Sequence, residues 1–335
     1  MAKLKGILSM ERGIFDYCYA PFEQKELKSL VDLIGGCPSK EKYTKKWLLK
    51  NIKEAEICIT GWGSIPFDEE VLKEAKKLKI LFHSAGSVRG LYDKAVRKNI
   101  RMVSNTWVNA IPVAEFALGA ILSGLKGVHY YQERFHKLGK KAWGRDLSSS
   151  KGYYQTTVGI IGLGCVGHKL VDLLKNFDFK VLVYSRPFTL EKANKLNVEK
   201  VNLEELMSRS DAVVLAAPNL PQNRHMINAN LLSLMKDKAI FINIARGALV
   251  NENALIKELK RGRITAFLDV TDPEPPKENS PFYNLKSCIL TPHIAGSLGN
   301  ECYRFGKATV KEIKKYLNGE SLKGEISEKN FFYRA

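Results

Sequence analysis

The chain has 335 residues, of which 45% are hydrophobic and 26% are charged. This length supports two sizeable hydrophobic cores, and the composition is that of an ordinary globular protein, which excludes a disordered chain. The longest apolar run, Ile111–Leu125, is interrupted by Glu115 and is shorter than the roughly 20 residues of a bilayer span, so we expect no membrane helix. The N-terminus has no secretory pattern and the six cysteines are scattered, which predicts a cytoplasmic protein with reduced thiols and no metal site.

The chain has an excess of basic residues, which we attribute to its solvent-exposed surface. Lys and Arg number 53 against 35 Asp and Glu, for a net charge of +18. The lysines recur at helical spacing, as in Lys73, Lys76 and Lys77, and no zinc-finger, RNP or heptad pattern accompanies them. We therefore expect a solvated lysine-rich surface that also attracts anionic ligands, and no nucleic-acid partner.

Short apolar runs alternate with amphipathic segments along the whole chain, which is typical of parallel α/β sheets. The predicted strands cover residues 5–8, 57–60, 80–83, 101–103, 157–161, 180–184, 212–216, 239–244, 264–270 and 288–290. The predicted helices cover residues 24–34, 69–77, 91–98, 113–138, 169–177 and 300–317. The last helix has no strand of its own to cover, so we place it on the first of two doubly wound α/β domains.

A phosphate-binding loop is predicted at the start of the second βα series. The apolar strand 157–161 runs into Gly162-Leu163-Gly164-Cys165-Val166-Gly167, and a helix pattern follows directly. Gly162 permits a tight turn, Gly164 lets the backbone approach a pyrophosphate, and Gly167 lets helix and strand pack closely. A glycine-rich turn without a ligand is the alternative, but the strand, loop, helix and next strand are all in place and favour a dinucleotide site.

The end of the second strand of this series bears on cofactor choice. An NAD-specific site places a carboxylate there for the ribose hydroxyl, whereas this strand ends in Ser185-Arg186-Pro187. Ser185 can hydrogen-bond a 2′-phosphate, and Arg186 can pair with it or lie on the adenine. We predict a preference for NADP(H), with NAD(H) as the alternative if Arg186 is only a surface charge.

Three late strands each end in a polar cluster, where ligands of open α/β sheets bind. Arg246 follows the first, Glu274 follows the second within a proline-rich turn, and His293 follows the third. We interpret them as a set for reducing a 2-oxo acid. Arg246 binds the carboxylate and polarises the ketone, His293 donates a proton, and Glu274 orients His293 and favours its protonated form. Each residue alone has a structural explanation as a surface charge or a satisfied histidine.

With these segments the chain resembles the D-isomer-specific 2-hydroxyacid dehydrogenase family over nearly its whole length. The resemblance is carried by 109–116, the glycine loop, 210–218, 245–250, 268–275 and 291–296. It implies a flavodoxin-like substrate domain, residues 1–108 plus 299–335, with a Rossmann cofactor domain, residues 109–298, inserted into it. It also implies that Arg246, Glu274 and His293 are the catalytic trio, that Ala217, Pro218, Ala245 and Asp269 contact the cofactor, and that the chain dimerises through residues 112–144.

The same resemblance predicts substrate-binding residues in the first domain. Backbone N–H groups of the loop 84–89, at Ser87 and Val88, are expected to bind the substrate carboxylate, although Arg89 stands where many relatives have Asp. Trp62, after an earlier strand, either lines the pocket or packs in the core.

The function implied is NAD(P)-dependent reduction of a small 2-oxo acid, such as glyoxylate or hydroxypyruvate, to the D-2-hydroxy acid. The alternative is a dinucleotide-sensing, corepressor-like interaction protein on the same fold, because fold alone does not determine function.

Overall fold

The computed structural model describes residues 3–89, 100–143 and 150–327 of the chain. The chain divides into two compact units: unit 1 is Met1–Ala110 with Ser297–Ala335, and unit 2 is Ile111–Gly296. The predicted domain boundaries are 108/109 and 298/299, two residues from these divisions.

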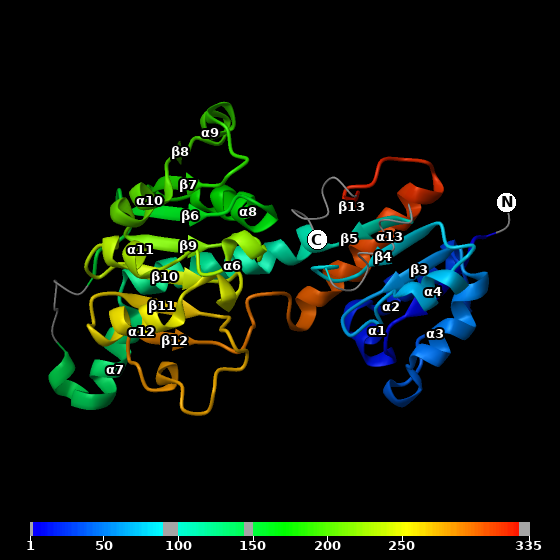
Figure 1. Cartoon of the computed structure of the whole chain (residues 1–335), viewed down its shortest axis with the longest axis horizontal. Coiled ribbons are helices and arrows are strands. Elements are labelled where there is room, and N and C mark those ends of the chain that lie inside the picture. Colours follow the sequence, from blue (N-terminus) through cyan, green and yellow to red (C-terminus); the bar gives the residue numbers. More distant parts are fainter. Residues whose placement is uncertain (1–2, 90–99, 144–149, 328–335) are drawn as a thin grey trace. The chain divides into compact units, whose positions relative to one another are not determined.

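Unit 1 is built on one mainly parallel sheet. Its described strands follow the order β13-β5-β4-β3-β1-β2, in which only β13 is antiparallel to its neighbour (Figure 1). From β2 to β5 the order 2-1-3-4-5 is that of flavodoxin-like folds. The strands are β1 (Lys5–Ser9), β2 (Asp32–Gly35), β3 (Ile57–Thr60), β4 (Ile80–His83), β5 (Arg101–Ser104) and β13 (Glu325–Ile326).

Helices cover both faces of this sheet because its strands are apolar on both sides. Ile57 and Ile59 of β3 belong to one buried cluster and Cys58 to the other, as alternation along a strand requires. The first cluster takes side chains from α1 (Arg12–Cys18), α2 (Pro21–Leu30) and α13 (Tyr303–Leu317), and the second from α3 (Lys45–Asn51) and α4 (Glu69–Glu74).

Unit 2 is built on a second sheet, whose described strands are all parallel. The order β12-β11-β10-β9-β6-β7-β8 changes direction between β6 and β9, which is the topological switch point of a Rossmann fold (Figure 1). The strands are β6 (Thr157–Ile161), β7 (Lys180–Tyr184), β8 (Glu199–Lys200), β9 (Ala212–Leu215), β10 (Ile240–Asn243), β11 (Thr265–Leu268) and β12 (Cys288–Leu290). The predicted α/β class with two parallel sheets is confirmed.

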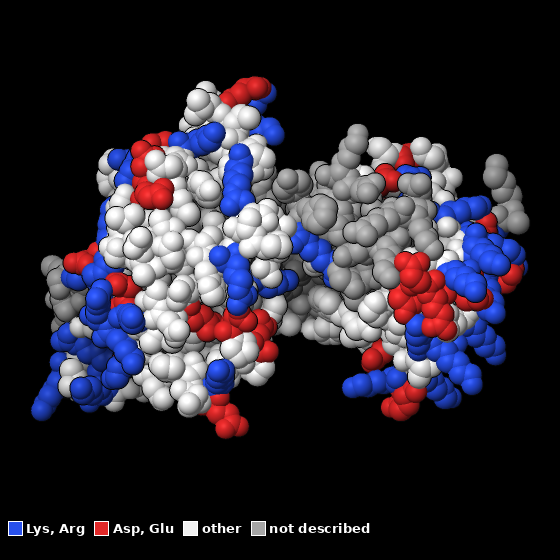
Figure 2. Space-filling model, in the orientation of Figure 1, with Lys and Arg blue, Asp and Glu red and all other residues white. Residues whose placement is uncertain are grey.

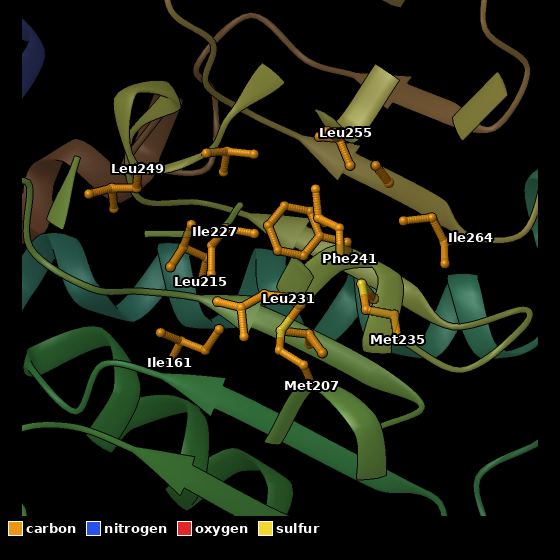
Figure 3. Packing of buried hydrophobic residues seen from close by; sticks show 14 of the residues in the cluster. Ile161, Met207, Leu215, Ile227, Leu231, Met235, Phe241, Leu249, Leu255 and Ile264 are labelled. Carbon is orange, nitrogen blue, oxygen red and sulfur yellow. The ribbon is translucent and has the colours of Figure 1, made fainter. Parts of the chain in front are cut away.

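The core of unit 2 also has two layers. Figure 3 shows Phe241 of β10 among Leu231, Met235 and Leu255, with Ile161 and Leu215 from neighbouring strands nearby. This cluster lies under α10 (Leu203–Arg209), α11 (Ala229–Leu234) and α12 (Glu252–Lys260), and a second cluster lies under α6 (Thr106–Leu125) and α8 (Cys165–Leu174). The remaining helices are α7 (Val128–Leu138) and α9 (Leu190–Leu196).

Helix α6 is apolar because most of it is a core helix. By length and composition alone, its 20 residues with a mean hydropathy of 1.6 would suffice to cross a membrane. Half of the apolar 18-residue stretch of this helix is buried inside the protein. Val113, Ala117 and Ile121 pack in the second cluster of unit 2.

Two predicted helices differ from the observed ones. The predicted helix 24–34 is wrong beyond Leu30: Val31 caps α2, and the next residues pair in parallel with β1 as β2. The apolar residues of β2 fit both a helical period and a strand. Only pairing with β1 in the folded protein decides between the two. The predicted helix 113–138 is broken at Gly127, which has a φ of +67°. The predicted helix 91–98 lies outside the described residues.

Basic residues are spread over the surface rather than aligned in one stripe. Figure 2 shows Lys and Arg interspersed with Asp and Glu, with a gathering of basic side chains at the position of α7. The end of α7 and the following turn contribute Lys137, Lys140 and Lys141.

Unit 1 contains a buried histidine that makes stability depend on pH. Burial lowers the pKa of His83 to about 4 from an ordinary 6.5. The ring is 2% exposed, and its Nδ1 lies 2.9 Å from Thr60 Oγ1. Below pH 6.5 the unfolded chain therefore binds a proton that the folded chain excludes, so stability falls as the pH drops from 6.5 towards 4.

We predict that the free energy of unfolding of unit 1 falls by roughly 2 kcal/mol more in the wild type than in His83→Gln between about pH 7.5 and about pH 5. The comparison cancels the carboxylates that the two chains share. Urea titrations followed by tryptophan fluorescence test this, because three of the four tryptophans, Trp47, Trp62 and Trp107, lie in unit 1. Parallel pH dependence in both chains would contradict it.

Candidate active site

The glycine loop of unit 2 contains two positions that accept no side chain. Gly162, after β6, has a φ of +101°, and a Cβ there would lie 2.7 Å from the carbonyl carbon of Ala216. A Cβ on Gly167 would lie 2.3 Å from the Gly162 oxygen. The two glycines thus let the turn close against β9 and let α8 start against the turn.

Gly164 is different, because a Cβ built on it would have no atom within 4 Å. It is the N-cap of α8 and supplies no side-chain cap, while Cys165 behind it is exposed and Val166 is half-buried. The positive end of the α8 dipole therefore faces open space, into which an anion fits. The geometry suits a dinucleotide pyrophosphate.

The other predicted cofactor residues follow strands next to this loop. Ser185 is half-buried and Arg186 exposed immediately after β7, and neither Tyr184 nor Pro187 beside them carries a carboxylate. Ala217 and Pro218 follow β9, where the Ala217 Cα would lie 2.7 Å from a Cβ on Gly162.

Glu274 and His293 form a hydrogen-bonded pair. Their Oε1 and Nδ1 atoms lie 2.5 Å apart, and the side chains are 40% and 47% exposed. An ionised carboxylate only accepts, so this bond places the hydrogen on Nδ1 and leaves Nε2 for another partner. His293 has a φ of +55°, a conformation that costs a non-glycine residue about 1–2 kcal/mol.

Asp269 holds the segment that carries His293. This carboxylate is 2% exposed and accepts from Thr291 Oγ1 at 2.7 Å, Ile294 N at 2.8 Å and Ala295 N at 2.9 Å. The Asp269 carbonyl also accepts from His293 N at 3.0 Å. The sequence predicts that Asp269 contacts the cofactor. In the structure its side chain is hydrogen-bonded to the turn after β12 and fixes the shape of that turn.

The backbone beside Arg246 contacts the turn after β11, which leads to Glu274. Asn243 Nδ2 donates to the Arg246 carbonyl at 3.1 Å, and Asn243 Oδ1 accepts from Ala245 N at 3.1 Å. A Cβ on Gly247 would lie 2.0 Å from the carbonyl carbon of Thr271, so this glycine lets the turn after β10 touch the turn that leads to Glu274. The Arg246 guanidinium is exposed, and its Nη1 donates to Ala245 O at 2.6 Å.

A cavity of about 720 Å³ adjoins the pair. Glu274, His293, Asp269 and Thr271 line it together with apolar residues such as Phe282. Arg246 does not line it. The structure therefore joins Glu274 and His293 directly and Arg246 only through neighbouring backbone.

The substrate residues predicted in unit 1 follow its strands. Trp62, after β3, packs edge-on against Phe305 with ring centroids 5.2 Å apart. Ser87 is exposed in the loop after β4, whereas Val88 is 0% exposed, backbone included, so of these two predicted contacts only Ser87 is accessible to a ligand.

The sequence reasoning missed three supporting residues. Asn243 orients the turn after β10, and Thr291 orients the turn after β12. Glu252 orients the turn after β11, where its Oε1 accepts from Asp272 N at 2.8 Å. Burial raises the pKa of the Glu252 carboxyl. A buried asparagine at the end of an apolar strand, Phe241-Ile242-Asn243, was a usable signal, whereas the other two contacts depend on tertiary structure.

The sheet order and the glycine loop at its switch point define a dinucleotide-binding Rossmann domain. Comparison with known proteins narrows this class. Residues 118–295 match the model of the NAD-binding domain of the D-isomer specific 2-hydroxyacid dehydrogenases. That match covers more than half of the chain, which therefore belongs to this family, as its motifs predict.

Two curated relatives and one solved structure illustrate the likeness. Glyoxylate reductase of Pyrococcus horikoshii is 34% identical over 82% of this chain and 83% of that protein. D-3-phosphoglycerate dehydrogenase of Methanocaldococcus jannaschii is 32% identical over 92% of this chain, which spans only 59% of that protein. The apo D-mandelate dehydrogenase of Rhodotorula graminis has a TM-score of 0.83, covers 98% of each chain, and at 21% identity shows the fold alone.

The contrast between Gly162 and Gly164 gives a matched test of the dinucleotide site. Gly164→Ala should keep the melting temperature of unit 2 while weakening NADPH binding by about tenfold or more, because its Cβ occupies space left for the ligand. Gly162→Ala should lose stability and binding together, because its Cβ meets β9 backbone. Thermal melts and fluorescence titration with NADPH measure both, and wild-type affinity in Gly164→Ala would contradict the assignment.

Proposed function

We propose that the chain reduces a small 2-oxo acid, such as glyoxylate or hydroxypyruvate, to the D-2-hydroxy acid with a nicotinamide dinucleotide. The proposal is carried by the hydrogen-bonded Glu274–His293 pair, whose residues follow the carboxyl ends of β11 and β12 and line a cavity. The glyoxylate reductases among the relatives support this substrate class. The corepressor-like alternative has no comparable support, because the relatives cited here are named reductases and dehydrogenases.

The proton chemistry follows from the pair. With Nδ1 bonded to Glu274, His293 Nε2 is the atom that gives a proton to the substrate oxygen. Glu274 holds the orientation of the ring through the Nδ1 hydrogen bond. A bound nicotinamide supplies the hydride.

Arg246 is proposed to bind the substrate carboxylate and polarise the keto oxygen. Its backbone is held on both sides by Asn243, so the exposed guanidinium projects from a fixed base. A planar guanidinium offers paired donors that match a carboxylate. In unit 1 we propose that the loop of Ser87 and Val88 binds substrate through the backbone N–H of the exposed Ser87, with the buried Val88 supporting the loop, and that Trp62 is a candidate contact.

A panel of 2-oxo acids with NADPH and NADH tests this function, and His293 tests the mechanism. His293→Asn should lower kcat by about 10²–10⁴-fold, because asparagine tolerates the positive φ but cannot donate the proton. His225→Asn is a matched control, since His225 is another exposed histidine of unit 2 with a φ of +51°. Turnover within threefold of wild type in His293→Asn would remove this residue from the mechanism.

We propose further that NADP(H) is the preferred cofactor. Ser185 and Arg186 supply a hydroxyl and a guanidinium after β7, where a carboxylate would repel a 2′-phosphate. The family match identifies an NAD-binding domain and does not distinguish NADP(H) from NAD(H), so the preference between the two is the proposal made here.

We predict a kcat/KM for NADPH about tenfold above that for NADH. Arg186→Ala should abolish most of this difference by lowering kcat/KM for NADPH alone, because only NADPH carries the 2′-phosphate. Lys192→Ala, which removes an exposed cation from the nearby helix α9, is the control and should change neither value. Initial rates with both cofactors decide the matter, and a clear NADH preference in the wild type would refute it.

We propose further that the chain forms a homodimer and acts in the cytoplasm. Helix α7 buries no residue within the chain, and its region exposes large apolar side chains, from Val128 at 48% to Trp143 at 84%. Such a surface is typical of subunit contacts. A monomer in sedimentation analysis would contradict this assignment.

A further inference from the structure

The loop after β4 is held at several points, and the exposed residue among them is Ser87. Ser84, Ala85 and Val88 are 0% exposed, whereas Ser87 is exposed. The loop therefore presents one residue to solvent from a buried frame.

A chain of buried hydroxyl groups fixes the start of the loop. Ser84 Oγ is hydrogen-bonded to Tyr19 Oη and lies 2.9 Å from Thr309 Oγ1. Asn105 Nδ2 in turn donates to Thr309 Oγ1 at 2.8 Å. Tyr19 directly follows α1 and Thr309 lies in α13, so Ser84 is tied to two separate parts of unit 1, and Asn105 after β5 joins the same network through Thr309.

Two more hydroxyl groups hold the centre of the loop. Ser104 Oγ donates to the Gly86 carbonyl oxygen at 2.7 Å, and Thr106 Oγ1 donates to the same oxygen at 3.0 Å. The two hydroxyls also lie 2.7 Å from each other. The two hydroxyls share two protons among these three contacts, so the carbonyl is held by one hydroxyl directly and by the other either directly or through the first, which restrains the plane of the peptide that joins Gly86 to Ser87.

This fixed plane determines where the Ser87 N–H points. The Gly86–Ser87 peptide is trans, and in a trans peptide the N–H points opposite to the carbonyl. The Ser87 N–H thus points away from Ser104 and Thr106, and no described residue accepts a hydrogen bond from it. The Ser87 hydroxyl instead accepts from Arg89 N at 3.3 Å, which leaves the backbone donor for a ligand.

We propose that Ser104 and Thr106 are positioning residues, which orient the Ser87 N–H for the substrate carboxylate by holding the Gly86 carbonyl. The proposal rests on the function proposed above, and it goes further by assigning two residues that need not touch substrate. Without the two hydroxyls this peptide can rotate, and an N–H that must first be oriented binds an anion more weakly.

Steady-state kinetics with glyoxylate separate this role from a structural one. In Ser104→Ala/Thr106→Val, KM for glyoxylate should rise by about tenfold, while kcat and KM for the dinucleotide stay within twofold. Thr106→Ser restores a hydroxyl and should keep the wild-type KM. Ser123→Ala is the control, since it removes another α6 hydroxyl that donates to a carbonyl, Ala120 O, at 3.4 Å. Thr106→Val alone is nearly isosteric and guards against loss of folding, which melting curves monitor.

An unchanged KM in the double variant would overturn the proposal, as would a fall in kcat for both the double variant and Thr106→Ser. If the wild type reduces no 2-oxo acid, the proposed function fails separately. The positioning role is then decided by the ¹⁵N–¹H resonance of Ser87 during titration with glycolate. A shift in the wild type that is lost in the double variant supports the proposal, and equal responses, or none in either, refute it.

Discussion

The buried carboxylate of Asp269 determines the geometry of the Glu274–His293 pair. A carboxylate with 2% exposure is tolerated only when its oxygens are hydrogen-bonded, and here all three donors belong to residues 291–295. Each such bond contributes about 1.5–3 kcal/mol, so together they outweigh the roughly 1–2 kcal/mol that the positive φ of His293 costs. The turn cannot relax without leaving a buried charge unpaired. Asp269 thereby stabilises the strained backbone that directs His293 towards Glu274.

Glycine supplies the complementary constraint, which is close approach of backbone. Gly162, Gly167 and Gly247 each face backbone atoms at a distance that no Cβ could occupy, while Gly164 faces open space. The first three therefore act on the protein itself and the fourth on a ligand. The glycine motif predicts this division for Gly162, Gly164 and Gly167, and the space around each Cα agrees with it, whereas Gly247 lies outside the motif and its role needed the structure.

Period and apolarity were enough to predict ten of the described strands, β1, β3 to β7 and β9 to β12, because buried parallel strands are continuous apolar runs. Strand β2 was missed because Val31, Leu33 and Ile34 continue the apolar period of α2, and only pairing with β1 separates the two. The positions of Arg246, Glu274 and His293 at strand ends followed from the sequence as well. The support from Asp269 did not, because its partners at residues 291–295 are brought to it by tertiary structure, whereas Asn243 acts locally on Ala245 and Arg246.

In both units the same physical means hold the backbone beside a proposed ligand-binding donor. In unit 2, side-chain oxygens and amides hold the backbone around Arg246 and His293. In unit 1, the hydroxyls of Ser104 and Thr106 hold the Gly86 carbonyl. In each case the group offered to a ligand is exposed, while its support is largely buried. Ordering the support during folding means that the cost in conformational entropy is met before a ligand arrives. Binding energy can then be used for discrimination between substrates, and for this reason we expect substitutions in such supports to change substrate affinity without touching the substrate.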